Sequence, residues 1–399
     1  MLKIEEALEL ILKNSSQLKP VEVDLLESLN HVIAEDIFSK EDIPHFDKSA
    51  MDGYVIKAEK TKTIKEFEVV GVVKAGDFYE GQIEEDKALK IMTGAAVPTG
   101  LDCVVQIEKN LSPSSEILKI DQAFDIGNNI IKKGSEIKKG ELAIGEGTFL
   151  RPSHIGFLAS LGHQKVKVYP YPKVTGLITG DELLEVDEVL QAGKIRNSNS
   201  YSLKALCKDM GIEDISTVRV SDTLEDTSKK LKEAFKENDI VMTSGGASVG
   251  EYDFVKDALK SIGATIHFEK VSIKPGKPLV FATYKDKLFF GIPGNPLSLI
   301  TIFEEFIKPS IYKVMGKDQS RRHFKVVLKD DFKVSRGRTN YVYCDIEENN
   351  GVFFAYNLGS QCSNQLSTIS TANGIIIVSG EEAVAKRGDT VYGKYIFEK

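Results

Sequence analysis

The sequence lacks the features that mark several large classes of protein. It has only four cysteines in 399 residues, and no two of them form a CxxC pair. This spacing argues against a zinc site or a disulfide framework and fits a reducing compartment. No apolar run is long enough to span a bilayer, and the N-terminus has neither the basic start nor the unbroken apolar stretch of a signal peptide. These absences predict a soluble, cytoplasmic protein.

A surplus of basic residues is absent as well. The formal net charge is −7 and the isoelectric point is about 5.6, so a general affinity for nucleic acid is not expected. The six histidines show no metal-ligand spacing, and no nucleophile can be paired with a base along the chain. Chemistry that depends on a metal ion and on charge is therefore favoured over covalent catalysis.

The central part of the chain alternates apolar runs with helical patterns. Strands are expected at residues 173–179, 215–220, 239–243, 264–271, 278–284 and 287–292. Helices are expected at residues 200–211, 223–238, 254–263 and 297–315. This alternation predicts a mostly parallel sheet covered by helices. Short β-rich runs between about Phe46 and Gly147, and again after Gly316, predict further strand-rich domains on either side.

Four turns that follow strands of this sheet carry unusual residues. They are GDEL with Asp181 and Glu182, the pair Ser221–Asp222, SGGASVGEYD with Glu251 and Asp253, and PGNP at residues 293–296. Because ligands bind at the carboxyl ends of the strands in an open parallel sheet, we expect these turns to converge on one site.

The glycine-rich turn admits two interpretations. It is either a tight connection between strand and helix or a cradle whose backbone N–H groups bind phosphate. Its acids are either helix-terminal residues that stabilise the helix dipole or metal ligands. If Asp181, Glu182, Asp222 and Asp253 meet, their repulsion requires a cation, and Mg²⁺ bridging to a substrate phosphate is the natural one. Both interpretations stay open at this point.

The segment IKPGKPL places Lys274 and Lys277 in a turn that its prolines restrict. Such lysines are either merely solvated or form a clamp for an oxyanion. In PGNP, Asn295 is a good N-cap and Pro296 a good first helical residue. The loop FDKSAMDGY, which contains Asp52, and the loop MTGAAVPTG have no place near the sheet edge that periodicity can assign.

Taken together, the segments resemble one family. FDKSAMDGY, IMTGAAVPTGLDCVV, GDEL, TSGGASVGEYD, IKPGKP and GIPGNP occur in the order typical of molybdopterin molybdenumtransferases of the MoeA type, whose relatives include the E domain of gephyrin. The resemblance covers essentially the whole chain. It implies a multidomain α/β plus β fold with four domains. These are a discontinuous N-terminal linker domain (1–45 and 141–170), a β-rich insertion domain (46–140), a doubly wound, mostly parallel α/β domain (171–316) and a C-terminal β-barrel-like domain (317–399).

The same resemblance implies the reaction and the residues that perform it. Adenylylated molybdopterin and molybdate would yield molybdenum cofactor and AMP with Mg²⁺, in a homodimer whose active site is shared between subunits. The implied catalytic residues are Asp52, Thr93, Glu182, Asp222 and Asp253, of which Glu182, Asp222 and Asp253 would bind the metal. The implied substrate-binding residues are Ser248, Lys274, Lys277, Pro278 and Arg338.

Two segments depart from the family pattern. In NNIIKKGSEI, Ile131 stands where an arginine is expected, so Lys132 or Lys133 would have to supply the charge. In GSQCSNQLSTISTANG, the ligand-facing residue is one of Ser363, Ser367 or Thr368. Two alternatives to the transferase share the fold, namely an adenylyltransferase that acts one step earlier and a non-catalytic scaffold.

Overall fold

The structure is a computed structural model that describes residues 1–245, 254–317, 323–362 and 364–396. Ser248, Glu251, Asp253 and Ser363, which the sequence analysis names, lie outside the described residues. Contacts divide the chain into two compact units. The larger unit comprises Met1–Ala34, Gly147–Arg151 and Lys165–Lys399, and the smaller comprises Glu35–Glu146 and Pro152–Gln164.

The larger unit is built on a six-stranded sheet in the order β16-β13-β17-β21-β20-β18. The strands are β13 (Val174–Thr179), β16 (Ile215–Val220), β17 (Ile240–Ser244), β18 (Thr265–Phe268), β20 (Val280–Tyr284) and β21 (Lys287–Ile292). The first four in this order run parallel to one another. At one edge, β20 pairs antiparallel with β21, and β18 pairs antiparallel with β20. The predicted mostly parallel sheet is therefore confirmed.

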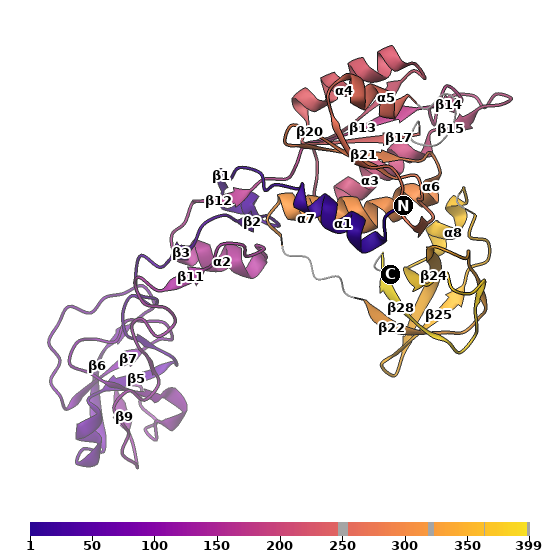
Figure 1. Ribbon diagram of the computed structural model, residues 1–399. Coiled ribbons are helices and arrows are strands. Elements are labelled where there is room, and N and C mark those ends of the chain that lie inside the picture. The colour runs from indigo at the N-terminus through magenta and orange to yellow at the C-terminus, as the bar shows by residue number, and fades with distance from the viewer. Residues whose placement is uncertain (246–253, 318–322, 363, 397–399) are drawn as a thin grey trace. The chain divides into compact units, whose positions relative to one another are not determined.

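Helices cover both faces of this sheet. Figure 1 shows α4 (Leu224–Glu237) and α5 (Val255–Ser261) on one face, and α3 (Ser198–Asp209) and α6 (Pro296–Ile302) on the other. Alternate residues of the strands divide between two cores, because side chains in a strand point to opposite faces. Met242 packs in the core beneath α3 and α6, whereas its neighbour Val241 packs in the core beneath α4 and α5. The doubly wound arrangement is thus confirmed.

The helix expected at residues 297–315 is interrupted. It consists of α6, a π-helical turn η4 (Phe303–Ile307) and α7 (Lys308–Val314). Pro309 gives a physical reason, because proline has no N–H to donate to the carbonyl four residues earlier and its ring crowds that carbonyl. The N-terminal helix α1 (Ile4–Lys13) contacts η4 and α7 and buries Ile4, Ala7 and Ile11 in the same core. A small sheet, β1 (Val21–Asp24), β12 (Lys165–Tyr169) and β2 (Val32–Ile33), completes this part of the unit.

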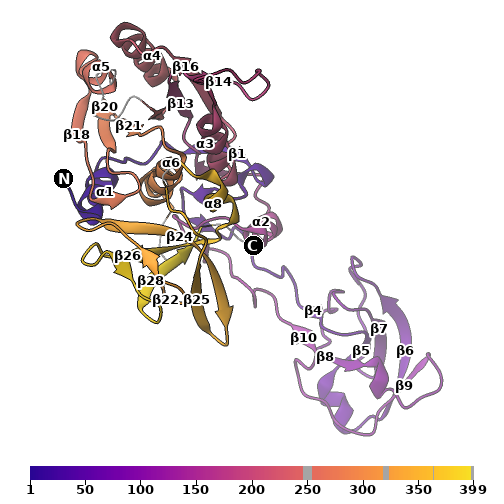
Figure 2. The same ribbon diagram turned by 90° about the vertical axis from the view of Figure 1, so that its right-hand side faces the viewer.

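The C-terminal strands close into a barrel. Around the ring the strands are β24 (Thr339–Asn349), β25 (Val352–Asn357), β22 (Phe324–Leu328), β28 (Thr390–Tyr395) and β26 (Gly374–Val378), and β26 pairs back with β24. In β24, Val342 faces the barrel core, while Tyr341 and Tyr343 belong to the core of the α/β domain. The helix α8 (Leu366–Thr371), which the sequence did not predict, contacts both α6 and β24 (Figure 2). The predicted barrel-like domain is confirmed.

The smaller unit holds a five-stranded sheet in the order β8-β5-β7-β6-β9. Its strands are β5 (Gly53–Ile56), β6 (Glu66–Val73), β7 (Lys87–Ile91), β8 (Cys103–Gln106) and β9 (Ile117–Lys119). Two short pairs accompany them, β3 (Ile37–Phe38) with β11 (Leu142–Ile144) and β4 (Lys48–Ser49) with β10 (Ile130–Ile131). The unit also contains helix α2 (Pro152–Ser160), which begins at a proline, a residue that suits the first helical position.

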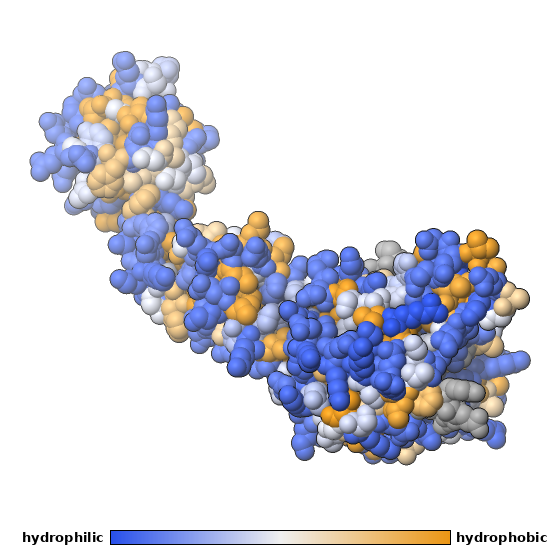
Figure 3. Space-filling model, turned by 90° about the horizontal axis from the view of Figure 1, so that it is seen from above, coloured by the Kyte–Doolittle hydropathy of each residue, from blue (hydrophilic) through white to orange (hydrophobic). Residues whose placement is uncertain are grey.

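Hydrophilic residues dominate the surface shown in Figure 3, and apolar residues are scattered between them. A search of the described helices found none with the length and apolar character required to cross a membrane.

Candidate functional site

The predicted turns converge on one edge of the six-stranded sheet. The register pairs Thr179 with Val220, and Ser244 with both Ile178 and Ile292. The turns that follow β13, β16, β17 and β21 therefore leave the sheet at nearly the same level. The third of these turns is described only as far as Gly245.

Close contacts tie the strand ends together. Gly245 has a φ of +93°, and a Cβ atom there would lie 2.6 Å from the Thr179 Oγ1 atom, so only glycine fits. The buried side chain of Asn199, in the first turn of α3, donates to the Ser244 hydroxyl and to the Gly294 carbonyl, each at 2.7 Å. Sequence reasoning missed Asn199, because no local pattern shows that these two turns meet.

Three carboxylates gather at this edge. Burial, together with the charges of Asp181 and Glu182, raises the pKa of Asp222, while an N–H donated by the Asp181 backbone opposes the rise. The main chain around Glu182 is fixed, because the Ile195 N–H donates to its carbonyl at 3.0 Å. The Lys194 ammonium donates to the Asp181 carbonyl at 2.8 Å. The charges of Asp181 and Glu182 thus act on Asp222, and hydrogen bonds hold the backbone of the GDEL turn.

These carboxylates fit a divalent cation, because such an ion would relieve the repulsion that opposes the ionisation of Asp222. Among the residues that the structure describes, no three His, Cys, Asp or Glu side chains are grouped as metal ligands. Of the three predicted ligands, Glu182 and Asp222 are brought together, and Asp253 falls outside the described ranges.

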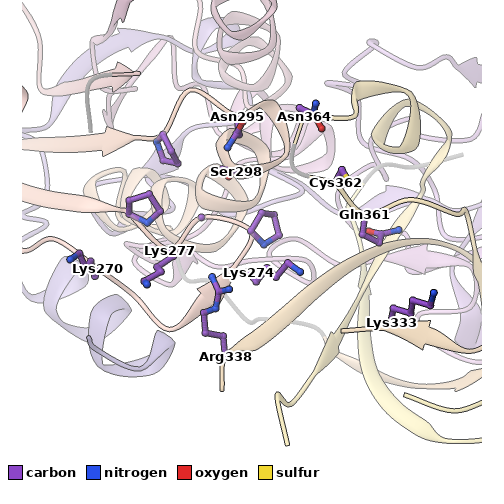
Figure 4. Close-up of a pocket in the computed structure, with 14 residues that line it drawn as sticks. Lys270, Lys274, Lys277, Asn295, Ser298, Lys333, Arg338, Gln361, Cys362 and Asn364 are labelled. Carbon is purple, nitrogen blue, oxygen red and sulfur yellow. The ribbon is translucent and has the colours of Figure 1, made fainter. Parts of the chain in front are cut away.

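A cavity of about 850 Å³ lies between the α/β domain and the barrel. Figure 4 shows side chains from both domains around it. Its lining residues are Lys270, Lys274, Pro275, Gly276, Lys277, Pro278, Pro293, Asn295, Ser298, Lys333, Arg338, Gln361, Cys362 and Asn364. Five of these side chains are cationic, and none of the described lining residues is a carboxylate. We call this cavity the cationic pocket.

The structure brings all four described substrate-binding candidates to this pocket. Lys274, Lys277, Pro278 and Arg338 line it together, although Arg338 comes from the barrel and the others from the α/β domain. The sequence did not predict Lys270, Lys333 or Gln361 in this role. Lys270 and Lys333 stand in segments without a recognisable motif, and Gln361 stands in the segment GSQCSNQLSTISTANG, in which only Ser363, Ser367 and Thr368 were considered. The packing of the two domains reveals their common position.

A pairing between the two domains positions the cations. The short strand β19 (Ile273–Lys274) runs parallel to the start of β24, with Lys274 beside Asn340. The Lys274 ammonium donates to the Ser335 hydroxyl at 2.5 Å. Gly276 has a φ of +107°, and a Cβ atom there would lie 3.0 Å from Ile302, so the turn between the two lysines packs tightly on α6. The lysines are therefore held on a rigid turn.

The PGNP turn serves both the helix and the pocket. Pro296 is the first residue of α6, as predicted. Asn295 occupies the N-cap position, but its side chain makes no capping hydrogen bond within the described part of the chain and instead lines the pocket.

The C-terminal segment contributes different residues from those considered in the sequence. Gln361, Cys362 and Asn364 line the pocket. Thr368 is buried and donates to the Ser360 carbonyl at 2.9 Å. Neither Thr368 nor Ser367 is among the lining residues that the structure describes.

In the smaller unit, the two predicted catalytic residues contact each other. The Thr93 N–H and the Thr93 hydroxyl both donate to the Asp52 Oδ1 atom, at 2.7 and 2.8 Å. The N–H bond, followed by the hydroxyl bond, lowers the pKa of Asp52, so this exposed carboxylate is held in its charged form. In the divergent segment, the Lys132 ammonium lies 2.7 Å from the Asp47 carboxylate.

Three segments of the chain match models of known protein families. The doubly wound α/β domain matches the family described as "Probable molybdopterin binding domain" over residues 176–313. Residues 2–162 match the MoeA N-terminal region (domain I and II), and residues 325–392 match the MoeA C-terminal region (domain IV).

Full-length relatives agree with these matches. A molybdopterin molybdenumtransferase of Staphylococcus epidermidis is 36% identical over 98% of this chain and 94% of its own length, and one of Staphylococcus aureus is 33% identical over 97% and 94%. A crystal structure of the molybdopterin biosynthesis MoeA protein from Pyrococcus horikoshii superposes with a TM-score of 0.81 at 29% identity, covering 99% of this chain and 100% of the other. The chain belongs to the MoeA family, which confirms the family and fold that the sequence predicted.

Proposed function

We propose that this protein is a molybdopterin molybdenumtransferase. It takes adenylylated molybdopterin and molybdate, hydrolyses the adenylyl link with Mg²⁺, inserts molybdenum at the dithiolene and releases AMP and molybdenum cofactor. The observation that carries the proposal is the separation of charge within the larger unit. A pocket lined by five cations and the carboxylates Asp181, Glu182 and Asp222 provide separate places for an oxyanion and a divalent cation. The names of the relatives support the same activity.

In this proposal, the cationic pocket binds molybdate. Lys274, Lys277 and Arg338 donate charge-assisted hydrogen bonds to its oxygens, and Pro278 shapes the wall beside them. Ser248, from the glycine-rich turn, is assigned to the same substrate. Because the pocket is large compared with one oxyanion, it also leaves room for the dithiolene end of the pterin.

Glu182, Asp222 and Asp253 are the residues that would hold Mg²⁺. When bound, this ion neutralises the carboxylates and polarises the phosphate oxygens of the adenylyl link. The Asp181 N–H that donates to the Asp222 carboxylate connects the GDEL turn to Asp222, and the charge of Glu182 acts on the same carboxylate.

Asp52 and Thr93 complete the proposed site from the smaller unit. We assign them to the active site of the second subunit in a homodimer, and the Thr93 bonds keep Asp52 ionised for that role. The proposal includes the four-domain division given above and a cytoplasmic location. Neither nucleic acid nor a membrane is a partner in it.

The decisive experiment supplies purified protein with Mg²⁺, molybdate and adenylylated molybdopterin. We expect AMP release together with cofactor that activates an apo-molybdoenzyme. Absence of both products, under conditions in which the Staphylococcus epidermidis relative forms them, would refute the proposal. Consumption of ATP in the presence of molybdopterin would instead identify the adenylyltransferase activity.

A further inference from the structure

The turn that carries Arg338 is organised by one buried side chain, that of Asn340. Asn340 is 2% exposed and lies at the start of β24. Its Oδ1 atom accepts from the Ser335 N–H at 2.9 Å. Its Nδ2 atom donates to the carbonyls of Ser335 and Arg338, each at 2.9 Å. All three hydrogen bonds of this amide are therefore made to one turn, residues 335–338.

Each end of that turn is associated with one cation of the pocket, Lys274 at Ser335 and Arg338 itself. Ser335 accepts the hydrogen bond from the Lys274 ammonium, and Arg338 itself lines the cavity. Asn340 also pairs with Lys274 in the β19–β24 register. One amide thus connects the barrel's arginine with a lysine of the α/β domain.

The same turn also packs closely against Gly380. A Cβ atom on Gly380 would lie 2.3 Å from the Arg338 carbonyl and 2.6 Å from its N atom. The Gly337 N–H donates to the Gly380 carbonyl at 2.9 Å. The backbone of Arg338 is therefore held by both Gly380 and the Asn340 amide, so loss of the amide would remove one of these two contacts.

We propose that Asn340 is a positioning residue for the cationic pocket, which holds Lys274 and Arg338 at the spacing that a tetrahedral oxyanion requires. This inference rests on the proposed function, because it presumes that the pocket binds molybdate. The physical reason is that charge-assisted hydrogen bonds weaken steeply when donor and acceptor are misaligned. Asn340 acts through these two cations and does not itself line the described pocket.

A merely structural role for Asn340 is the competing explanation, and the chain offers a matched control. Asn373 is a buried asparagine of the same domain, 4% exposed. Its amide accepts from the Ile346 N–H at 2.7 Å and donates to the Ile346 carbonyl at 2.8 Å. Neither Asn373 nor Ile346 lines the pocket as described, so Asn373→Ala removes a similar amide without touching the cations.

The test measures AMP release against molybdate concentration, with thermal unfolding measured in parallel. For Asn340→Ala we expect the half-saturating molybdate to rise about tenfold, while the rate at saturating molybdate changes less than about twofold. Ser335→Ala, which removes only the hydroxyl that accepts from Lys274, should raise it about threefold. Asn373→Ala should lower the unfolding temperature without altering the molybdate dependence.

A further variant separates failure of this inference from failure of the proposed function. If Arg338→Ala leaves the molybdate dependence unchanged, the proposed molybdate pocket is wrong. If Arg338→Ala weakens molybdate use but Asn340→Ala does so no more than Asn373→Ala, the positioning role is overturned. Should Asn340→Ala fail to fold, Ser335→Ala decides the matter, and an unchanged half-saturating molybdate in that variant rejects the proposal.

Discussion

The cationic pocket and the acidic edge of the sheet, which carries Asp181, Glu182 and Asp222, lie in the same unit but are organised in different ways. In the pocket, Lys274 bonds to Ser335, and the turn that carries Arg338 is held by Asn340. At the acidic edge, the charges that act on Asp222 are those of Asp181 and Glu182, which are carboxylates like itself. In the first region hydrogen bonds position the cations, whereas in the second they fix only the backbone and the carboxylates repel one another.

This difference indicates how the two regions meet their ligands. A pocket whose cations are already oriented loses little conformational freedom when an oxyanion binds, so its geometry sets affinity. A cluster of carboxylates on a fixed backbone requires a bound cation to balance its charge. The negative charge of the cluster should therefore determine how the rate depends on Mg²⁺ concentration. Substitutions in the two regions should therefore change different kinetic parameters.

The largest effect is expected from Asp222→Asn. Loss of one charged oxygen at the acidic edge should lower the rate of AMP release about 100-fold by weakening the Mg²⁺ site. The molybdate dependence of the residual activity should stay within about twofold of the original, since the pocket is untouched. A variant that loses molybdate affinity instead would show that the two regions are not separate.

A smaller effect is expected from Lys277→Ala in the cationic pocket. We expect the half-saturating molybdate to rise about tenfold, with the rate recovered at high molybdate, because one charge-assisted contact is removed and the metal site is intact. Titration of molybdate at saturating Mg²⁺ measures this. If the rate stays low at every molybdate concentration, Lys277 has a different role.

The preformed geometry of the pocket can be tested at Gly276. Gly276→Ala should reduce the free energy of unfolding by about 2 kcal/mol, from the strain of a non-glycine residue at positive φ and the contact with Ile302. Gly263→Ala is the control, because Gly263 also has a positive φ, +83°, but no atom within 4 Å of the added Cβ. Denaturant unfolding should show the larger loss for Gly276→Ala, and equal losses would show that the turn is not tightly packed.

The smallest effect concerns the stability of the acidic edge. The raised pKa of Asp222 means that the folded protein binds more protons than the unfolded chain, so its contribution to stability falls as pH rises from the ordinary Asp value through the raised one. At neutral pH without Mg²⁺, Asp222→Asn should therefore unfold slightly higher, by about 1 °C, since solvent screens most of the repulsion. Mg²⁺ should raise the unfolding temperature of the original protein more than that of the variant, as calorimetry can establish.

Local patterns in the sequence were sufficient to predict the α/β sheet, whereas the four-domain arrangement came from the family resemblance. The alternation of strands and helices places β13, β16, β17 and β21 in one parallel sheet, and residues 215–220 and 287–292 have the predicted bounds. Those runs are short, rich in β-branched or aromatic residues and bounded by turn residues, so local chemistry determines them. The π-helical turn at Phe303–Ile307 was not predicted, because a single proline alters a helix whose apolar period continues through it.

The site could be predicted only where residues stand in recognisable turns. GDEL, IKPGKP and PGNP can be recognised in the sequence by their glycines, prolines and charged residues. Asn199 and Ser335 cannot, because each contacts a segment that lies far away in the sequence. Asn340 bonds only to nearby residues of its own turn, but its proposed role depends on the distant Lys274, which Ser335 contacts. The roles of Ser248 and Asp253 stay predictions, since both residues lie outside the part of the chain that the structure describes.

The separation of an oxyanion pocket from a metal site is tested most directly by a crossed titration. AMP release is measured over a grid of Mg²⁺ and molybdate concentrations for the original protein, Asp222→Asn and Lys277→Ala. We predict that Asp222→Asn changes only the Mg²⁺ dependence and the maximal rate, and that Lys277→Ala changes only the molybdate dependence. If either substitution shifts both dependences by the same factor, the two regions form a single site and the account is contradicted.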